Sequence, residues 1–202
     1  MIIPINIAVE DTLSEAVLRQ IIKRDGRYAI GVCYRRNGYG YLKKTIRGFN
    51  NAAKGTPYIV LADLEAKCPP EQLRKWLPVP MHSNLIFRIA VREIEAWLLA
   101  DGNSIASFLG ISRNLLPTDV DSIDDPKQCL INLARRSRRR ELREAIVPDH
   151  NTTAKIGPDY NGQLSFFVSR LWNLSNAVKR SDSLCRATKA INSFQPIWDA
   201  RS

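Results

Sequence analysis

Acidic side chains follow three of the four predicted strands of this chain. They are Glu10 after residues 2–9, Asp63 and Glu65 after residues 58–62, and Glu93 and Glu95 after residues 84–91. Because the carboxyl ends of parallel strands meet at one edge of a sheet, we expect these five carboxylates to lie near one another. Such a cluster repels itself unless a cation neutralises it, and oxygen ligands suit Mg²⁺ or Mn²⁺. The spacing therefore predicts a divalent-cation site.

A purely structural interpretation of the same acids stays open. Strand ends are exposed to water, and acidic residues there often cap the helix that follows. Asp11 and Glu15 fit that role at a helix beginning near Thr12, and Glu93 fits the first turn of a later helix. One acidic strand end would be unremarkable, whereas acids at the same end of three strands favour the chemical interpretation.

Strands that alternate with helices must position these acids. Apolar runs predict strands at residues 2–9, 28–34, 58–62 and 84–91, and helical patterns lie between them at residues 12–25, 41–53 and 69–77. This alternation predicts an α/β fold with a mostly parallel sheet flanked by helices. Residues 1–110 are expected to form this core.

The second half contains no strong strand pattern. Helical patterns cover residues 103–109, 126–146, 161–179 and 181–194, after a helix that begins near Arg92. We therefore expect residues 111–202 to form a helical extension that packs on the core as part of a single compact unit.

The basic charge belongs to the whole chain. The 202 residues carry a net charge of +10, and each half has 15 basic and 10 acidic residues. Such an excess favours polyanionic partners. No apolar run has the roughly 18 to 20 residues of a membrane span, and the N-terminal segment does not resemble a signal peptide. Four scattered cysteines argue against a disulfide scaffold, so we expect a cytoplasmic protein.

Six arginines lie within nine residues of the predicted 126–146 helix. They are Arg135, Arg136, Arg138, Arg139, Arg140 and Arg143. They form either a solvated helix face or a surface that contacts nucleic-acid phosphates. Lys155, in a polar loop, is a further candidate phosphate contact, although a solvated lysine is the simpler interpretation. No glycine-rich phosphate loop or nucleophile elbow is present.

Three segments carry a resemblance to a known family. Residues 9–15 (VEDTLSE), 60–65 (VLADLE) and 92–101 (REIEAWLLAD) resemble the patterns VEGxTE, DLD and EIEAWLLAD of a Toprim-like family known as domain of unknown function 4276. Residues 157–161 (GPDYN) and 181–187 (SDSLCRA) resemble its late segment. The family is related to the Toprim domains of overcoming-lysogenization-defect nucleases.

The resemblance implies a Toprim-like Rossmannoid fold and an Mg²⁺-dependent endonuclease. Asp63 and Glu65 would hold the metal, Glu93 or Glu95 would complete its ligands, and Glu10 would act as general acid or base or as a further ligand. The resemblance also implies a partner ATPase of the ABC type and a role in anti-phage defence, with DNA or RNA as the substrate. A homo-oligomer stays open.

Two departures from the family pattern keep an alternative open. Asp11 replaces the usual glycine after the first glutamate, and Glu65 replaces the second aspartate. The alternative is a non-catalytic subunit with a degenerate Toprim site that binds nucleic acid or the ATPase. Phosphoryl transfer on a small nucleotide is a third possibility, although it would not need the arginine run.

Overall fold

A four-stranded parallel sheet forms the centre of the first of two structural units. The computed structural model describes residues 2–35, 40–65 and 67–198. Met1–Ile89 and Arg186–Ser202 make up the first unit, and Ala90–Cys185 make up the second. The expected α/β class, with a parallel sheet flanked by helices, is confirmed.

The strand order places the first and third strands side by side. The strands are β1 (Ile3–Val9), β2 (Tyr28–Arg35), β3 (Tyr58–Asp63) and β4 (Leu85–Ala90), in the order β2-β1-β3-β4. In register, Ala8 of β1 lies opposite Val60 of β3. The chain passes from β1 to β2 on one side and then crosses back to β3 on the other side of β1. The direction in which strands are added to the sheet therefore reverses, and the point of reversal lies between the neighbouring strands β1 and β3.

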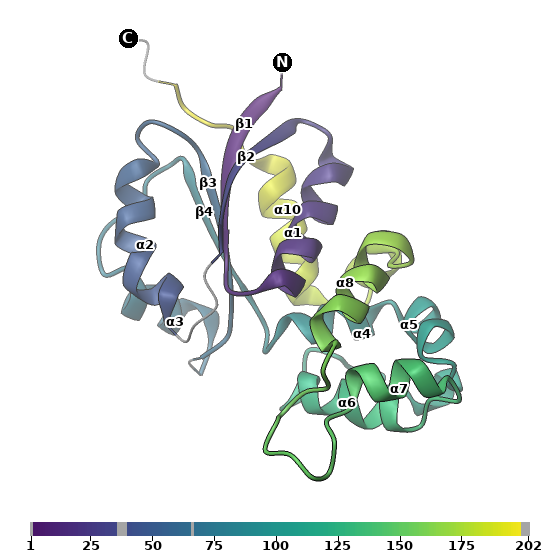
Figure 1. The fold of residues 1–202 in the computed structure, drawn as a ribbon. Coiled ribbons are helices and arrows are strands. Elements are labelled where there is room, and N and C mark those ends of the chain that lie inside the picture. Colours follow the sequence, from purple (N-terminus) through teal and green to yellow (C-terminus); the bar gives the residue numbers. More distant parts are fainter. Residues whose placement is uncertain (1, 36–39, 66, 199–202) are drawn as a thin grey trace. The chain divides into compact units, whose positions relative to one another are not determined.

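Helices cover both faces of this sheet (Figure 1). They are α1 (Thr12–Asp25), α2 (Tyr41–Ala52), α3 (Pro69–Trp76) and α10 (Asp182–Ser193), of which α10 belongs to the first unit from Arg186 onward. Figure 1 shows α2 and α3 on one face, with α1 and α10 on the other. Phe49, Tyr58, Trp76 and Phe87 pack in the core beneath α2 and α3. Burial of these rings, together with the aliphatic residues around them, stabilises this face.

The described part of the second unit consists of helices joined by loops. They are α4 (Ile94–Ala100), α5 (Gly102–Leu109), the short 3₁₀ turn η1 (Arg113–Leu115), α6 (Pro126–Arg135), α7 (Arg140–Ile146), α8 (Tyr160–Arg170) and α9 (Leu174–Val178). Every residue of α4 is buried, in keeping with a sequence that is apolar except at Glu95. Its Trp97 is 0% exposed and donates a hydrogen bond from Nε1 to Ser183 Oγ at 3.1 Å.

Two predicted helices are each interrupted. The expected helix over residues 126–146 is wrong as a single element, because α6 ends at Arg135 and α7 begins at Arg140. Between them Ser137, 2% exposed, accepts a hydrogen bond at Oγ from the Arg139 N–H, and its carbonyl accepts one from Arg143 Nη1. A continuous helix would also place like charges at i, i+4, as for Arg135 with Arg139 and Arg136 with Arg140, which is unfavourable. The expected helix over 161–179 is likewise divided, into α8 and α9.

None of the helices that the structure describes is long and apolar enough to span a membrane.

Candidate active site

Glu10 and Asp63 flank the point where the strand order reverses. Glu10 directly follows β1, and Asp63 is the last residue of the neighbouring strand β3. Both side chains are half-buried. In open parallel sheets, ligands bind at this reversal, outside the carboxyl ends of the two strands. The structure therefore brings these two predicted site residues to one edge, at the place where the fold favours ligand binding.

A buried glutamine fixes the loop that carries Asp63 and Glu65. Gln72 lies on α3 and is 0% exposed. Its Nε2 donates to the Asp63 carbonyl at 2.7 Å, and its Oε1 accepts from the Glu65 N–H at 2.5 Å. These two bonds satisfy both backbone groups and hold the loop in one conformation. The Glu65 side chain itself is exposed.

Asp11 has a structural role at the start of α1. It is the residue before the helix, and its Oδ1 accepts a hydrogen bond from the Ser14 N–H at 2.8 Å. Its backbone is extended, with φ at −143°, so no glycine is required at this position. The departure from the family's glycine is therefore compatible with an ordinary helix cap.

The acids of the first unit do not form a preformed metal cage. Among the residues that the structure describes, no group of three or more His, Cys, Asp or Glu side chains is arranged to hold a metal ion. Mg²⁺ is commonly held by one or two carboxylates together with water and substrate phosphates. The oxygen donors of Glu10 and Asp63 fit that simpler kind of site.

Glu93 and Glu95 lie in the second unit and contact a lysine there. Glu93 precedes α4, and its Oε2 accepts from the Lys127 N–H at 2.9 Å. The Lys127 ammonium lies 3.5 Å from Glu93 Oε1 and 3.6 Å from Glu95 Oε1. A fixed cation therefore neutralises part of this acidic pair. That these two residues form one cluster with Glu10, Asp63 and Glu65 stays a prediction.

Glu95 is the most deeply buried carboxylate of the predicted set. Its side chain is 1% exposed, and Tyr160 donates from its hydroxyl to Oε1 at 2.9 Å. Its other oxygen, Oε2, has no hydrogen-bond partner among the described residues. Burial raises the pKa of Glu95 to about 7, and the Glu93 charge adds to that rise, while Lys127 and Tyr160 oppose it. Such a group holds or releases a proton near neutral pH.

A glycine places Tyr160 against Glu95. The Gly157 N–H donates to the Ile146 carbonyl at 2.9 Å, and the Asp159 N–H donates to the Ala145 carbonyl at 3.0 Å. A Cβ on Gly157 would overlap the backbone of both acceptor residues. The close approach fixes the segment just before α8, which begins at Tyr160. This explains why a glycine precedes Tyr160 in the GPDYN segment.

Sequence reasoning missed Gln72, Lys127 and Tyr160. Tyr160 lies in a segment that resembles the family, and Lys127 follows the acidic linker at residues 119–125, so both had a weak signal. Gln72 had none. The last acid of the 92–101 motif, Asp101, is also structural in part, because its Oδ2 accepts from the Asn173 N–H at 2.7 Å.

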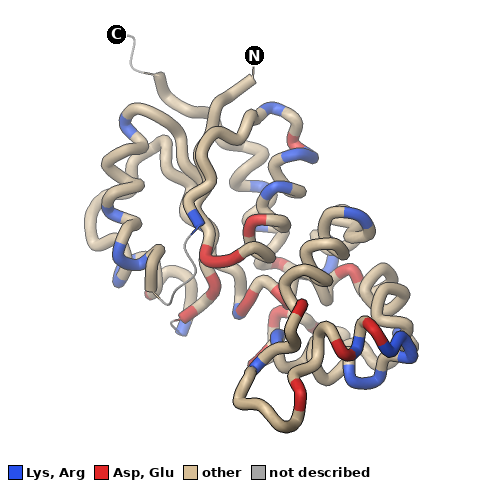
Figure 2. The backbone as a smooth tube through the Cα atoms, in the orientation of Figure 1, with Lys and Arg blue, Asp and Glu red and all other residues tan. Residues whose placement is uncertain are grey.

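The predicted nucleic-acid-binding arginines lie around the α6–α7 junction, where Figure 2 shows basic positions gathered. Arg135, Arg136, Arg138, Arg139 and Arg140 are exposed, whereas Arg143 is half-buried. Arg140 forms an ion pair with Glu144 at 2.7 Å, and Arg135 donates to Asn132 Oδ1 at 2.8 Å. Lys155 is exposed in the loop before α8. Contact of these residues with nucleic acid stays a prediction.

The fold and the strand-edge acids define an α/β protein of the Rossmannoid type. Comparison of the chain with family models, curated proteins and solved structures finds no match. The resemblance to the Toprim-like family stays a prediction, supported by the quoted motifs.

Proposed function

We propose that the protein is an Mg²⁺-dependent nuclease that hydrolyses phosphodiester bonds. The observation that carries the proposal is the position of Glu10 and Asp63 on either side of the β1–β3 strand reversal. We further propose, from the family resemblance, that it acts in anti-phage defence with an ABC-type ATPase. The net charge of +10 supports a polyanionic substrate.

Glu10 and Asp63 are the residues that would hold the metal, with Glu65 as a further ligand. A bound Mg²⁺ would neutralise phosphate charge and lower the pKa of a water molecule. The protein's own contribution is to fix the ligands. Gln72 holds the Asp63–Glu65 backbone by two hydrogen bonds, so that loop does not need to reorganise when a ligand binds.

Metal binding is the first test of this proposal. We expect calorimetry to detect Mg²⁺ or Mn²⁺ binding that Asp63→Ala or Glu10→Ala abolishes. Glu71→Gln is the matched control, because Glu71 lies on the nearby helix α3 and is paired with Lys75 at 2.7 Å. A nuclease assay with and without Mg²⁺, alone and with the co-purified ATPase, then tests hydrolysis. An active protein whose metal affinity and activity survive both alanine variants would contradict the assignment.

A non-catalytic subunit is the second candidate. Exposure of the Glu65 side chain and the lack of a three-carboxylate group among the described residues favour it. This candidate predicts that the protein binds nucleic acid or the ATPase with no detectable metal affinity and no cleavage. The same calorimetry and assay therefore decide between the two functions.

A further inference from the structure

A pocket runs along one face of α6 within the second unit. Its volume is about 470 Å³, which lies in the range of small-molecule sites. The pocket is lined by Ile123, Asp124, Asp125, Gln128, Cys129, Asn132, Leu133 and Arg136. From Asp125 onward the lining residues recur at i, i+3, i+4, i+7, i+8 and i+11, so they lie along a single helix face.

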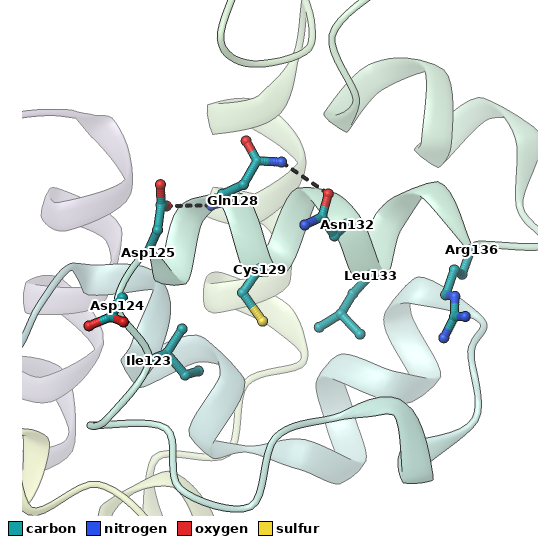
Figure 3. A pocket seen from close by; sticks show the side chains of 8 residues that line it. All are labelled: Ile123, Asp124, Asp125, Gln128, Cys129, Asn132, Leu133 and Arg136. Atoms are coloured by element: carbon teal, nitrogen blue, oxygen red, sulfur yellow. Dashed lines mark hydrogen bonds between the residues drawn. The ribbon is translucent and has the colours of Figure 1, made fainter.

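The two ends of this pocket have opposite charge. Figure 3 shows Asp124 and Asp125 at one end and Arg136 at the other. Asp124 is already paired, because its Oδ1 lies 3.0 Å from Arg92 Nη2. Asp125 Oδ1 accepts the Gln128 N–H at 2.7 Å, which caps α6. The second oxygens of Asp124 and Asp125 are therefore the acceptors that this end offers to a ligand, and Asp125 is the one that stands on the α6 face.

The opposite end offers a cation to an anionic group. Arg136 is exposed, and no ion pair among the residues that the structure describes includes its guanidinium. Exposed Arg135 and Arg138 flank it in sequence, which makes this end strongly positive. A phosphate is the group that such an end binds best, because guanidinium groups form paired hydrogen bonds with it.

The middle of the pocket is largely apolar. Ile123 and Cys129 are half-buried there, and Leu133 is 6% exposed. Burial raises the pKa of the Cys129 thiol, as does the Asp125 charge, so the sulfur is uncharged and acts as soft apolar surface. A flat ring with polar edges suits this surface better than a charged or bulky aliphatic group.

We propose that the α6 pocket binds one nucleotide of a nucleic-acid strand. Its base, bearing an exocyclic amine, lies on Ile123, Cys129 and Leu133, the amine donates to Asp125, and the phosphate binds Arg136. This inference rests on the proposed function in taking nucleic acid as the substrate. It adds a site on the second unit, separate in sequence from Glu10 and Asp63, that selects the base.

Titration of the full chain with mononucleotides tests the proposal. We expect CMP and GMP to bind more tightly than UMP and IMP, which lack the corresponding exocyclic amine, and inorganic phosphate to bind most weakly. Arg136→Gln should weaken CMP binding about tenfold. Arg170→Gln, which removes the same charge from an exposed position on α8 outside the pocket, should change it by no more than about twofold. Asp125→Asn retains the helix cap and should remove the preference for CMP over UMP.

A chemical footprint locates the ligand independently. Bound CMP should slow N-ethylmaleimide modification of Cys129, measured by mass spectrometry, and leave that of exposed Cys68 unchanged. Equal affinity for all nucleotides and phosphate, equal losses in the two arginine variants, or binding of an acidic peptide in place of nucleotides would overturn the inference. Nucleotide binding without hydrolysis of nucleic acid would count against the nuclease alone, whereas hydrolysis without base preference would count against the pocket alone.

Discussion

A buried carboxylate is stable as an anion only when hydrogen bonds or nearby cations replace the water that both of its oxygens have lost. In Glu95 only one of the two oxygens has such partners in the described part of the chain. Tyr160 and Lys127 both approach Oε1, while Oε2 has no partner among the described residues. The folded protein therefore favours the protonated form, with a pKa of about 7 against 4.5 for an ordinary glutamate. Because the folded state binds this proton more tightly than the unfolded state, the resulting stability is complete below pH 4.5 and is lost as the pH rises through about 7.

Glu95→Gln should remove this pH dependence, because the amide has the shape of the acid and never ionises. We expect the stability of the variant relative to the wild type to rise by about 3 kcal/mol from pH 4.5 to pH 8. Urea unfolding at both pH values measures the difference. Glu144→Gln is the control, since Glu144 is exposed and forms an ion pair with Arg140. The stability of this variant relative to the wild type should not change with pH. A Glu95→Gln difference that does not change with pH would contradict the assignment.

Cys33 should be much less reactive than Cys68. Burial, followed by the charge of Glu15 and its hydrogen bond, raises the pKa of the Cys33 thiol to about 11, whereas Cys68 is exposed. Alkylating agents attack the thiolate, so at pH 8 iodoacetamide should modify Cys33 at least about tenfold more slowly. Peptide mass spectrometry measures both rates in one sample. Glu15→Gln should speed modification of Cys33 and leave Cys68 unchanged, and equal wild-type rates would contradict the prediction.

At the scale of elements, buried apolar runs made the sheet predictable. All four strands lie within one residue of the bounds expected from the sequence. β1, β3 and β4 are nearly continuous apolar segments that are largely buried, as strands inside a parallel sheet require. The edge strand β2 has no buried residue and is predicted instead by its partly alternating, β-branched sequence. Strand ends then placed Glu10 and Asp63 at one edge. The strand order, which brings β1 beside β3, is a property of tertiary packing and could not be derived from these local patterns.

The interruptions between helices and the polar partners could not be predicted for a related reason. Ser137 fits a helical pattern by spacing, and only its buried hydrogen bonds to the next turn show that the chain bends there. Gln72 likewise resembles any helical glutamine until the loop after β3 folds onto it. Polar contacts between segments distant in sequence leave no periodic signal.

Gln72→Leu should destabilise the loop that follows β3. The variant leaves the Asp63 carbonyl and the Glu65 N–H without their partner, which costs about 2 to 3 kcal/mol. Urea unfolding measures the loss, and hydrogen exchange at the Glu65 amide should be faster. Arg74→Ala, an exposed change on the same helix, should alter stability by less than about 0.5 kcal/mol. Unchanged protection of the Glu65 amide would show that Gln72 does not hold the loop.

At the scale of the molecule, the charge of +10 is divided evenly between the two halves of the sequence. The strand-edge acids Glu10 and Asp63 are therefore a local exception within a basic chain. A basic surface attracts a nucleic-acid backbone over a distance of about one Debye length, roughly 8 to 10 Å at physiological salt. The arginines around the α6–α7 junction are the densest part of that charge in the sequence.

Replacing Arg138, Arg139 and Arg140 by alanine should weaken nucleic-acid binding and reduce its salt dependence. Each phosphate contact contributes about 0.9 to the slope of log affinity against log salt, so the slope should fall by at most about 3. Fluorescence anisotropy with a labelled oligonucleotide at several salt concentrations measures the slope. Replacing the exposed residues Lys23, Arg24 and Lys54 by alanine removes the same charge from the first unit and serves as the control. Because the general field weakens equally in both triple variants, a larger loss of slope in the arginine variant identifies direct phosphate contacts. Equal slopes would mean that the arginine run is a solvated surface or contacts a protein.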